Sequence, residues 1–244
     1  MDTLATRPSW VPQPVLDLAN RLGARTDGAA VRLTQHGTMR SGPGARRMKF
    51  SAEQTIQLRR PGFEWRASTG PAGCITVIDA LQRGSTTSEV RLLGCVRLAG
   101  TKLDDAAALL KGQLLRYLAE LAWAPDAILQ NALLQWSANG NSLHVAVQHR
   151  DVRCVLGITL DEEGRIGSVF TPNRPRKEDG GFVERPWLGN FSDYRNHRGR
   201  WLPFKGEVGW VLDGGLVNVW QGEITSWETD EIPAFEPAHR RERH

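Results

Sequence analysis

Hydrophobic and polar side chains alternate with a period of two along most of the chain, which is the pattern of half-buried β-strands. In residues 48–58, polar side chains occupy one face and hydrophobic ones the other, at Met48, Phe50, Ala52, Ile56 and Leu58. Similar stretches cover residues 31–36, 63–67, 74–81 and 89–98, and later 133–138, 143–148, 152–160, 165–170, 207–212 and 216–221. Turn signals such as Pro61-Gly62 and Asn139-Gly140 separate them, so the pattern predicts an antiparallel meander.

Two segments show instead the 3.6-residue period of an amphipathic helix. In the first, Gln13–Leu22, one face is apolar and Gly23 follows as a stop signal. The second, residues 104–123, places Asp105, Gly112, Gln113, Arg116 and Glu120 opposite an apolar stripe of Leu110, Leu114, Tyr117, Leu118 and Leu121. Asp104 or Asp105 is predicted to cap its start. Pro125 is predicted to end it, because the residue before a proline avoids helical geometry.

The order of these elements predicts the fold class. Five strands precede the long helix and further strands follow it, and one antiparallel sheet of some nine to eleven strands is expected to curl. An amphipathic helix is well placed to fill the concave side. We therefore predict a mainly-β (α+β) protein, a half-barrel wrapped around one central helix, with a short N-terminal helix. It forms a single domain over residues 1–230, followed by a disordered basic tail over residues 231–244.

Composition narrows the functional classes. The 244 residues are 40% hydrophobic, enough for a full core, and 31 Lys+Arg against 27 Asp+Glu give a net charge of only +4. The basic residues are scattered, so nucleic acid is an unlikely partner. Residues 1–13 lack a continuous apolar segment, so neither a signal peptide, an anchor nor a transmembrane segment is predicted, and the expected location is the cytoplasm. Cys74, Cys95 and Cys154 are expected to be buried thiols.

Several short motifs resemble those of a bacterial domain-of-unknown-function family. That family is marked by a Gln-x-Gly strand, a Pro-Gly-Phe-x-Trp turn and an Arg-Tyr-Leu-Ala-Glu helix followed by Trp-x-Pro. The chain has these at residues 35–37, 61–65, 116–120 and 123–125, with a further block from Pro186 to Trp210. The expected shape is also similar to the half-barrels of bacterial lipoprotein carriers, which hold an acyl chain against a curved sheet. The resemblance implies an architecture and no particular reaction.

Three titratable residues are candidates for acid–base catalysis: Asp79, Glu120 and His36. Glu120 lies four residues after Arg116, so the two form either an exposed helical ion pair or, if buried, a clamp or an anion and proton site. Asp79 shares a strand face with hydrophobic residues, either as a cap of the turn at residues 82–84 or as a general base in the lumen. His36 is either a partner of Asp79 across adjacent strands or a residue on a solvated strand face.

The candidates for ligand binding are mainly aromatic. Trp65, Trp123, Trp187 and Trp210 are predicted either to pack in the core or to line a pocket. Arg116 and Tyr194 are the other binding candidates, and Arg116 is expected to face the polar end of the ligand. Residues 193–198 read as a polar loop suited to a charged headgroup. The sequence shows no metal-ligand spacing, phosphate-binding loop, nucleophile elbow or dinucleotide fingerprint, so no metal and no cofactor are predicted.

These observations favour binding of a hydrophobic or amphipathic small molecule, such as a lipid, isoprenoid or polyketide-like compound, in the concave lumen. The first alternative is a cofactor-independent enzyme that acts on such a molecule through Asp79, Glu120 or His36. The second is a non-catalytic protein-interaction partner, which would expose an apolar patch instead.

Overall fold

The computed structural model describes residues 10–42, 44–93, 96–100, 106–140, 142–178, 181–212 and 215–231, with the backbone alone at 97–100 and 231. Its helices are α1 (Gln13–Leu22), α2 (Ala106–Ala119) and α3 (Ala127–Gln130), with 3₁₀ turns at Pro71–Gly73 and Glu120–Ala122. Its strands are β1 (Gly28–Met39), β2 (Met48–Gln57), β3 (Phe63–Thr69), β4 (Ile75–Gln82), β5 (Ser85–Leu92), β6 (Val96–Gly100), β7 (Gln135–Asn139), β8 (Ser142–His149), β9 (Val152–Leu160), β10 (Ile166–Glu178), β11 (Gly181–His197), β12 (Arg200–Leu212) and β13 (Gly215–Glu231).

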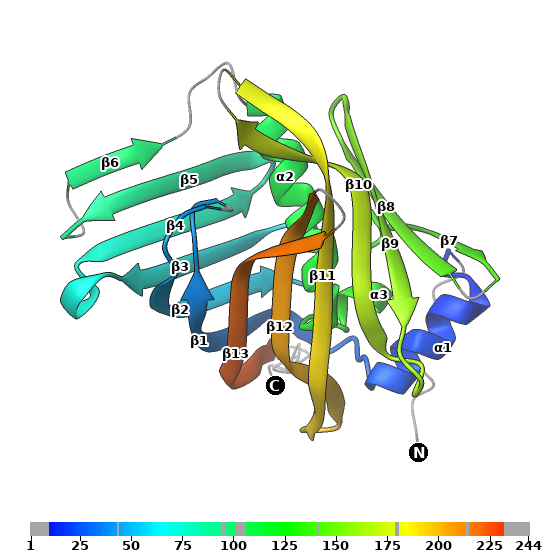
Figure 1. The fold of residues 1–244 in the computed structure, drawn as a ribbon. Coiled ribbons are helices and arrows are strands. Elements are labelled where there is room, and N and C mark those ends of the chain that lie inside the picture. Colours follow the sequence, from blue (N-terminus) through cyan, green and yellow to red (C-terminus); the bar gives the residue numbers. More distant parts are fainter. Residues whose placement is uncertain are drawn as a thin grey trace, which may run out of the picture.

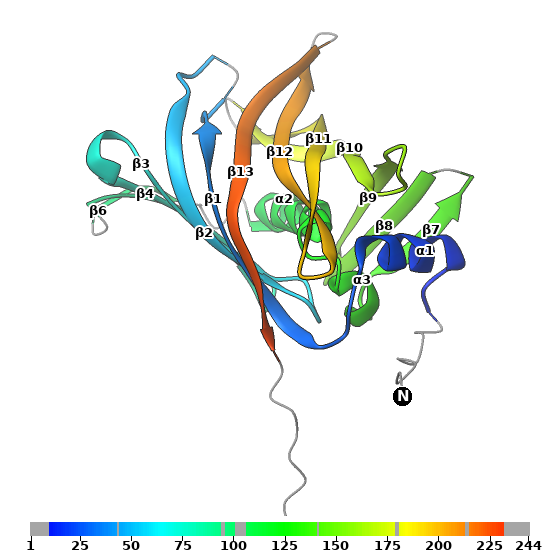
Figure 2. The same ribbon diagram turned by 90° about the horizontal axis from the view of Figure 1, so that it is seen from below.

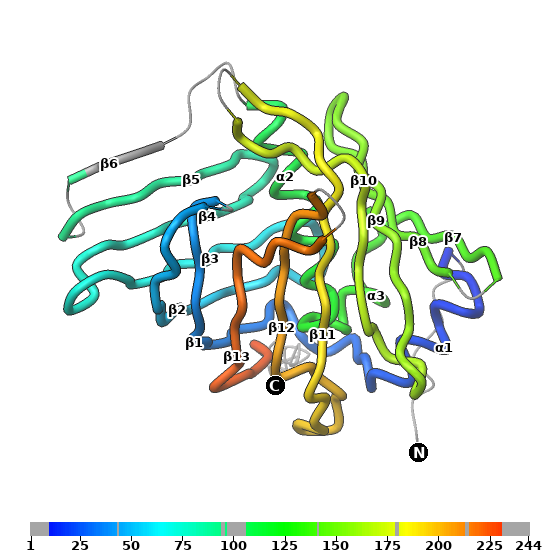
Figure 3. Tube along the Cα trace, viewed as in Figure 1, coloured from blue at the N-terminus to red at the C-terminus, as the bar shows by residue number. Residues whose placement is uncertain are grey.

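Within this described part, the thirteen strands form one curved sheet in the order β6-β5-β4-β3-β2-β1-β13-β12-β11-β10-β9-β8-β7 (Figure 1). The first and last strands, β1 and β13, pair antiparallel in the middle and join the two meanders (Figure 3). The edge strands are β6 and β7, and α2 lies between them in the sequence. The chain therefore has to cross from one edge to the other, and α2 makes that crossing inside the curve of the sheet (Figure 2). The predicted half-barrel around a central helix is confirmed.

Helix α2 is buried on more than its apolar stripe. Leu114 and Leu118 are almost inaccessible, as the period predicts, but Gln113 and Glu120 on the polar side are also buried. The Tyr117 hydroxyl donates a hydrogen bond to the Gln57 carbonyl oxygen (3.1 Å) and accepts one from Asn131 (2.8 Å), which ties the helix to β2. Since polar groups out of water need hydrogen-bond partners, the polar face of α2 must be satisfied by the sheet.

The curl of the sheet brings distant hairpins into contact. Gly84, in the β4–β5 turn, lies against the His149 imidazole at the end of β8, and a side chain at this glycine would overlap the ring. Strands β4 and β8 belong to opposite halves of the sheet and lie nine positions apart in its strand order. The contact shows how far the sheet wraps round the helix.

A buried ion pair fixes the chain where it leaves α2. Asp126 is fully buried, and its carboxylate accepts hydrogen bonds from the Arg200 guanidinium (2.6–3.2 Å) and from the backbone N–H of Arg25 (2.8 Å). Nearby, the Trp227 indole N–H donates to the Trp123 carbonyl oxygen (2.8 Å) and the Trp123 indole N–H to the Pro203 carbonyl oxygen (2.9 Å). The segment after α2 is thereby held on β12 and β13.

Several predictions about individual elements need correction. The stretch at 89–98 is the end of β5 and the start of β6 rather than one strand, and β11 was not predicted at all. Residues 193–197 belong to β11 and not to a loop, because the β11–β12 turn lies at Arg198 and Gly199. Alternating charged side chains on that exposed strand end conceal its period. The helix cap at Asp104 or Asp105 and the tail over residues 232–244 lie outside the described residues.

The cysteine prediction holds for one residue of three. Cys154 is buried, and this burial raises the pKa of its thiol to about 11. Cys74 is free and only partly buried, and Cys95 lies outside the described residues. No helix among the described residues is both long and apolar enough to cross a membrane.

We expect Asp126→Ala to lower the free energy of unfolding by about 3–5 kcal/mol, because it leaves the buried Arg200 guanidinium without its main partner. Urea unfolding followed by circular dichroism measures this. The matched control is Asp230→Ala, which removes the partner of Arg32 in an exposed pair on β1 and β13 and should cost less than about 1 kcal/mol. Equal effects of the two substitutions would contradict a fold-defining role for the Asp126–Arg200 pair.

Candidate functional site

A cavity of about 260 Å³ lies between α2 and the concave face of the sheet. Strands from both meanders and the end of α2 contribute to its wall. The lining residues are Gln35, Met39, Arg40, Gln54, Trp65, Val77, Asp79, Arg116, Ala119, Glu120, Trp123, Arg174, Trp187, Phe191, Val208, Trp210, Val219 and Trp220. We call it the lumen cavity.

Aromatic rings make up much of its apolar wall. Trp123 packs edge-on against Phe191 and Trp220, with ring centroids 5.4 and 5.9 Å apart. Trp220 in turn stacks on Phe50, and Phe50 meets Trp65 edge-on. A bulge in β13 adds to this wall, because Val219 and Trp220 both line the cavity although they are consecutive residues. The result is a continuous aromatic surface on one side of the cavity.

Arg116 is the centre of the polar side. Its Nε donates to Glu120 Oε1 (2.7 Å) and its Nη1 to Asp79 Oδ2 (3.0 Å), so one guanidinium holds two carboxylates. The same group lies over the rings of Phe63 and Trp65, 4.7 and 5.1 Å from their centroids. Asp79 is in the middle of β4, so it does not cap the turn at residues 82–84. The interaction is a partly buried clamp rather than an exposed helical pair.

The clamp continues into the sheet through two glutamines. Glu120 is only 5% exposed, and its second oxygen accepts a hydrogen bond from Gln54 Nε2 (2.7 Å). Gln54 Oε1 accepts one from Gln35 Nε2 (2.8 Å). This chain of hydrogen bonds runs from α2 through β2 to β1 and satisfies a carboxylate that would otherwise be costly to bury.

Arg174, on β10, is the charged residue of the wall whose hydrogen bonds are incomplete. Its guanidinium stacks over the Trp187 ring at 4.5 Å. Its Nη1 is inaccessible to solvent and has no hydrogen-bond partner among the described residues. Burial, together with the nearby positive charge of Arg116, lowers the pKa of Arg174 to about 10, so it remains a cation at neutral pH.

Seven of the nine predicted site residues line this one cavity: Asp79, Glu120, Arg116, Trp65, Trp123, Trp187 and Trp210. Tyr194 does not. It lies under the Arg165 guanidinium, and its hydroxyl donates to the Ile166 carbonyl oxygen (2.7 Å), as expected of a partly buried structural tyrosine. The chain brings together residues almost 150 positions apart because β3 and β4 face β11 and β12 across the helix.

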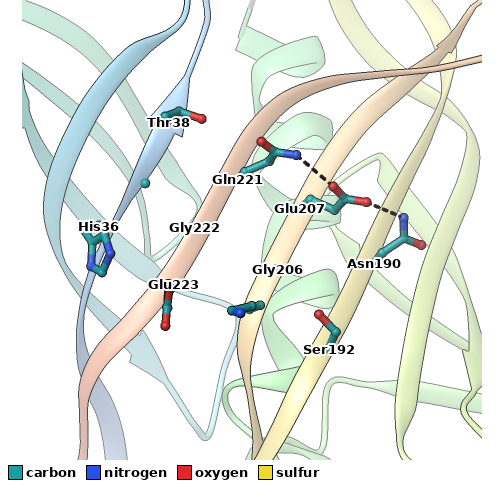
Figure 4. A pocket seen from close by; sticks show the side chains of 11 residues that line it. His36, Thr38, Asn190, Ser192, Gly206, Glu207, Gln221, Gly222 and Glu223 are labelled. Atoms are coloured by element: carbon teal, nitrogen blue, oxygen red, sulfur yellow. Dashed lines mark hydrogen bonds between the residues drawn. The ribbon is translucent and has the colours of Figure 1, made fainter.

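His36 lies on the other face of the sheet. With Thr38, Asn190, Glu223 and others it lines an outer groove of about 380 Å³ (Figure 4). Its neighbour Gln35 lines the lumen cavity instead. A partnership of His36 with Asp79 is wrong, because β2 and β3 separate β1 from β4. In the groove, Glu207 accepts hydrogen bonds from Gln221, Asn190 and Asn218 at 2.9–3.1 Å, and these lower its pKa.

The sequence did not indicate Gln54 and Arg174 as parts of the cavity, and Trp220, a tryptophan of the presumed sheet, was not among the predicted site residues. Gln54 sits at an alternate, inward position of β2, and a polar residue at such a position was the available signal. Arg174 falls just beyond the predicted strand at 165–170, so its face could not be assigned. Across the described part of the chain, no group of three or more His, Cys, Asp or Glu side chains is placed to hold a metal ion.

One protein family matches most of the chain. The sequence model of DUF6544, described as a family of unknown function, matches residues 6–222. The chain belongs to the DUF6544 family. This agrees with the resemblance to a family of unknown function that the motifs indicate, and no curated protein matches this DUF6544 chain.

Several solved structures are similar to it. A LolA superfamily protein from Nitrosomonas europaea has 10% identity and a TM-score of 0.44, over 91% of this chain and 95% of that one. A putative outer membrane lipoprotein-sorting protein domain from Vibrio parahaemolyticus has 9% identity and a TM-score of 0.49, over 88% and 90%. A DUF1329 family protein from Desulfovibrio piger has 12% identity and a TM-score of 0.39, over 88% and 92%. The function of this DUF6544 protein must therefore be argued from its own cavity.

We expect Glu120→Ala to destabilise the protein by about 3 kcal/mol, because Arg116 and Gln54 both lose a buried acceptor. Urea unfolding measures the loss, and Glu163→Ala, at an exposed partner of Arg165, should change stability by less than about 1 kcal/mol. A double-mutant cycle with Arg116→Met tests the pair itself. A coupling of only about 0.3–0.5 kcal/mol, the value for an exposed helical pair, would show that the clamp is not buried in solution.

Proposed function

We propose that this protein binds a hydrophobic or amphipathic small molecule in the lumen cavity. The observation that carries the proposal is the wall itself, in which five tryptophans and several aliphatic side chains surround a space bounded on one side by fixed polar groups. Concave, mostly apolar sites with a few convergent polar groups are typical of small-molecule binding.

The wall supports a preformed site rather than a packing defect. Asp79, Glu120, Gln54 and Gln35 are held in place by hydrogen bonds to one another or to Arg116, and Trp123 and Trp220 by a ring contact, so much of the wall is positioned without a ligand. A ligand entering a rigid site loses little free energy to reorganisation of the protein. Small apolar voids in ordinary cores have no such polar boundary.

A cofactor-independent enzyme is the second candidate, because Asp79 and Glu120 face the same cavity. Both carboxylates, however, are hydrogen-bonded by Arg116, and Glu120 by Gln54 as well. A substrate proton would therefore have to compete with the Arg116 guanidinium for these carboxylates. His36 faces the outer groove and cannot act with them on one molecule. The contacts therefore favour binding over proton transfer.

We expect the purified protein to take up the neutral fluorescent probe N-phenyl-1-naphthylamine, and Val77→Phe to weaken that uptake at least tenfold by filling the cavity. Fluorescence titration measures the affinity, and native mass spectrometry shows whether a small molecule co-purifies. The matched control is Thr76→Phe, whose side chain lies on the opposite face of β4 and should leave the affinity within about twofold.

Thermal unfolding must show that both variants are folded. A wild-type protein that takes up no probe and carries no co-purifying molecule would refute the binding proposal. Equal losses in Val77→Phe and Thr76→Phe would place the probe outside the lumen cavity.

A further inference from the structure

We infer that the ligand carries one negatively charged oxygen-acid head, and that Arg174 binds this head in the lumen cavity. The inference rests on the proposed function, because it names the chemistry of the molecule that the cavity would hold. Two sets of contacts support it: the hydrogen bonds that the other charged side chains of the wall form, and the acceptor that Arg174 Nη1 lacks among the described residues.

The first observation is the difference between Arg174 and the other arginines of the cavity. Arg116 donates to two carboxylates, and Arg40 donates from Nε to the Asn218 carbonyl oxygen (2.6 Å). Arg174 is fixed over the Trp187 ring, yet its buried Nη1 meets no acceptor among the described residues. A guanidinium N–H out of water without an acceptor is unfavourable, and an oxygen-acid group is the partner that best fits it.

The second observation is the charge of Arg174 itself. Arg174 retains its charge at neutral pH, as its pKa of about 10 implies. The carboxylates of Asp79 and Glu120 bond to Arg116, and among the described residues no carboxylate forms an ion pair with Arg174. A negatively charged head could pair with this guanidinium directly, whereas an ammonium head would be repelled by it.

The third observation concerns the kind of polar atom left unpaired. Of the three lining side-chain atoms that are buried without a partner in the described structure, two are donors, Arg174 Nη1 and Trp65 Nε1, and one is an acceptor, Gln35 Oε1. Surplus donors favour a head rich in acceptors. A carboxylate has two oxygens and no donor, and a phosphate monoester has more oxygens, so both belong to the class that this wall would recognise.

The effect of replacing Arg174 on protein stability distinguishes a structural role from a ligand-binding role. If Arg174 held the fold together, its replacement would destabilise the protein. If it is kept for a ligand, the empty protein bears the cost of an unsatisfied buried charge, so Arg174→Met should leave the unfolding midpoint unchanged or raise it while binding is lost. Stability and affinity should therefore change in opposite directions.

The experiment displaces N-phenyl-1-naphthylamine from the protein with four competitors of equal chain length: dodecanoate, dodecyl phosphate, dodecanol and dodecylamine. At pH 7.5 we expect an acid to bind at least tenfold more tightly than the alcohol, and Arg174→Met and Arg174→Gln to abolish this preference with little change for the alcohol. The control is Arg176→Gln, an arginine on the same face of β10 that lies over Trp210 and pairs with Glu178 outside the cavity wall. It should retain the preference.

The outcomes separate the two proposals. Tighter binding of either acid, lost in both Arg174 variants, supports the inference, and the stronger of the two acids identifies the head. Equal affinities for acid and alcohol, or a preference for the amine, overturn the inference and leave the proposed function intact. A marked fall of the unfolding midpoint in both Arg174 variants, or the same loss of preference in Arg176→Gln, also overturns it. Failure of all four competitors and of the probe itself refutes the proposed function.

Discussion

Every polar side chain of α2 that faces the sheet must find its hydrogen-bond partner inside the protein, because the sheet encloses the helix. This constraint follows from topology: β1 and β13 pair in the middle of the sheet, which leaves β6 and β7 as edges, and the chain between them has to cross the concave side. A helix on an open surface could leave Glu120 to water. Here the carboxylate is satisfied by Arg116 from its own helix and by Gln54 from β2, so the polar network and the curvature of the sheet require each other.

The same enclosure explains why a cavity forms where it does. Leucines along α2 fill the space against the sheet, but beyond Ala119 the helix tightens into a 3₁₀ turn and presents Glu120 and Trp123 instead. Planar indoles and paired charges pack with less freedom than leucines, since each must keep its hydrogen bonds and ring contacts. Trp123 is held at both ends by backbone hydrogen bonds that involve β12 and β13. The wall is therefore rigid, and the space between its aromatic and polar sides stays open.

The half-barrel could be predicted from the sequence, as could seven of the eighteen residues that line its cavity, and the reason is local. The alternation of residues 48–58 and of residues 63–67 and 74–81, with the 3.6-residue period of residues 104–123, specifies which side chains share a face, so Trp65, Asp79 and Glu120 could be named as candidates while their burial stayed open. What could not be predicted depends on long-range register. Whether Arg116 contacts water or Asp79 depends on how far the sheet curls. Whether the side chains of Tyr194 and His36 reach the lumen cavity depends on which face of their strands packs toward the helix. Arg174 was missed because β10 continues beyond its apolar part into Arg, Asn and Pro residues that resemble a loop.

Charged side chains on both faces of the sheet find hydrogen-bond partners, but Arg174 in the lumen differs from them, and this difference bears on function. On the outer face, near solvent, Glu207 is surrounded by three amide donors from β11 and β13. These strands can evidently provide several partners for one charge. Inside the lumen, where water is scarcer and an unmet hydrogen bond costs more, Arg174 on the adjoining β10 has an Nη1 atom with no acceptor in the described structure. The incomplete hydrogen bonding of Arg174 is therefore the feature of the lumen on which the proposed recognition of an acidic head depends.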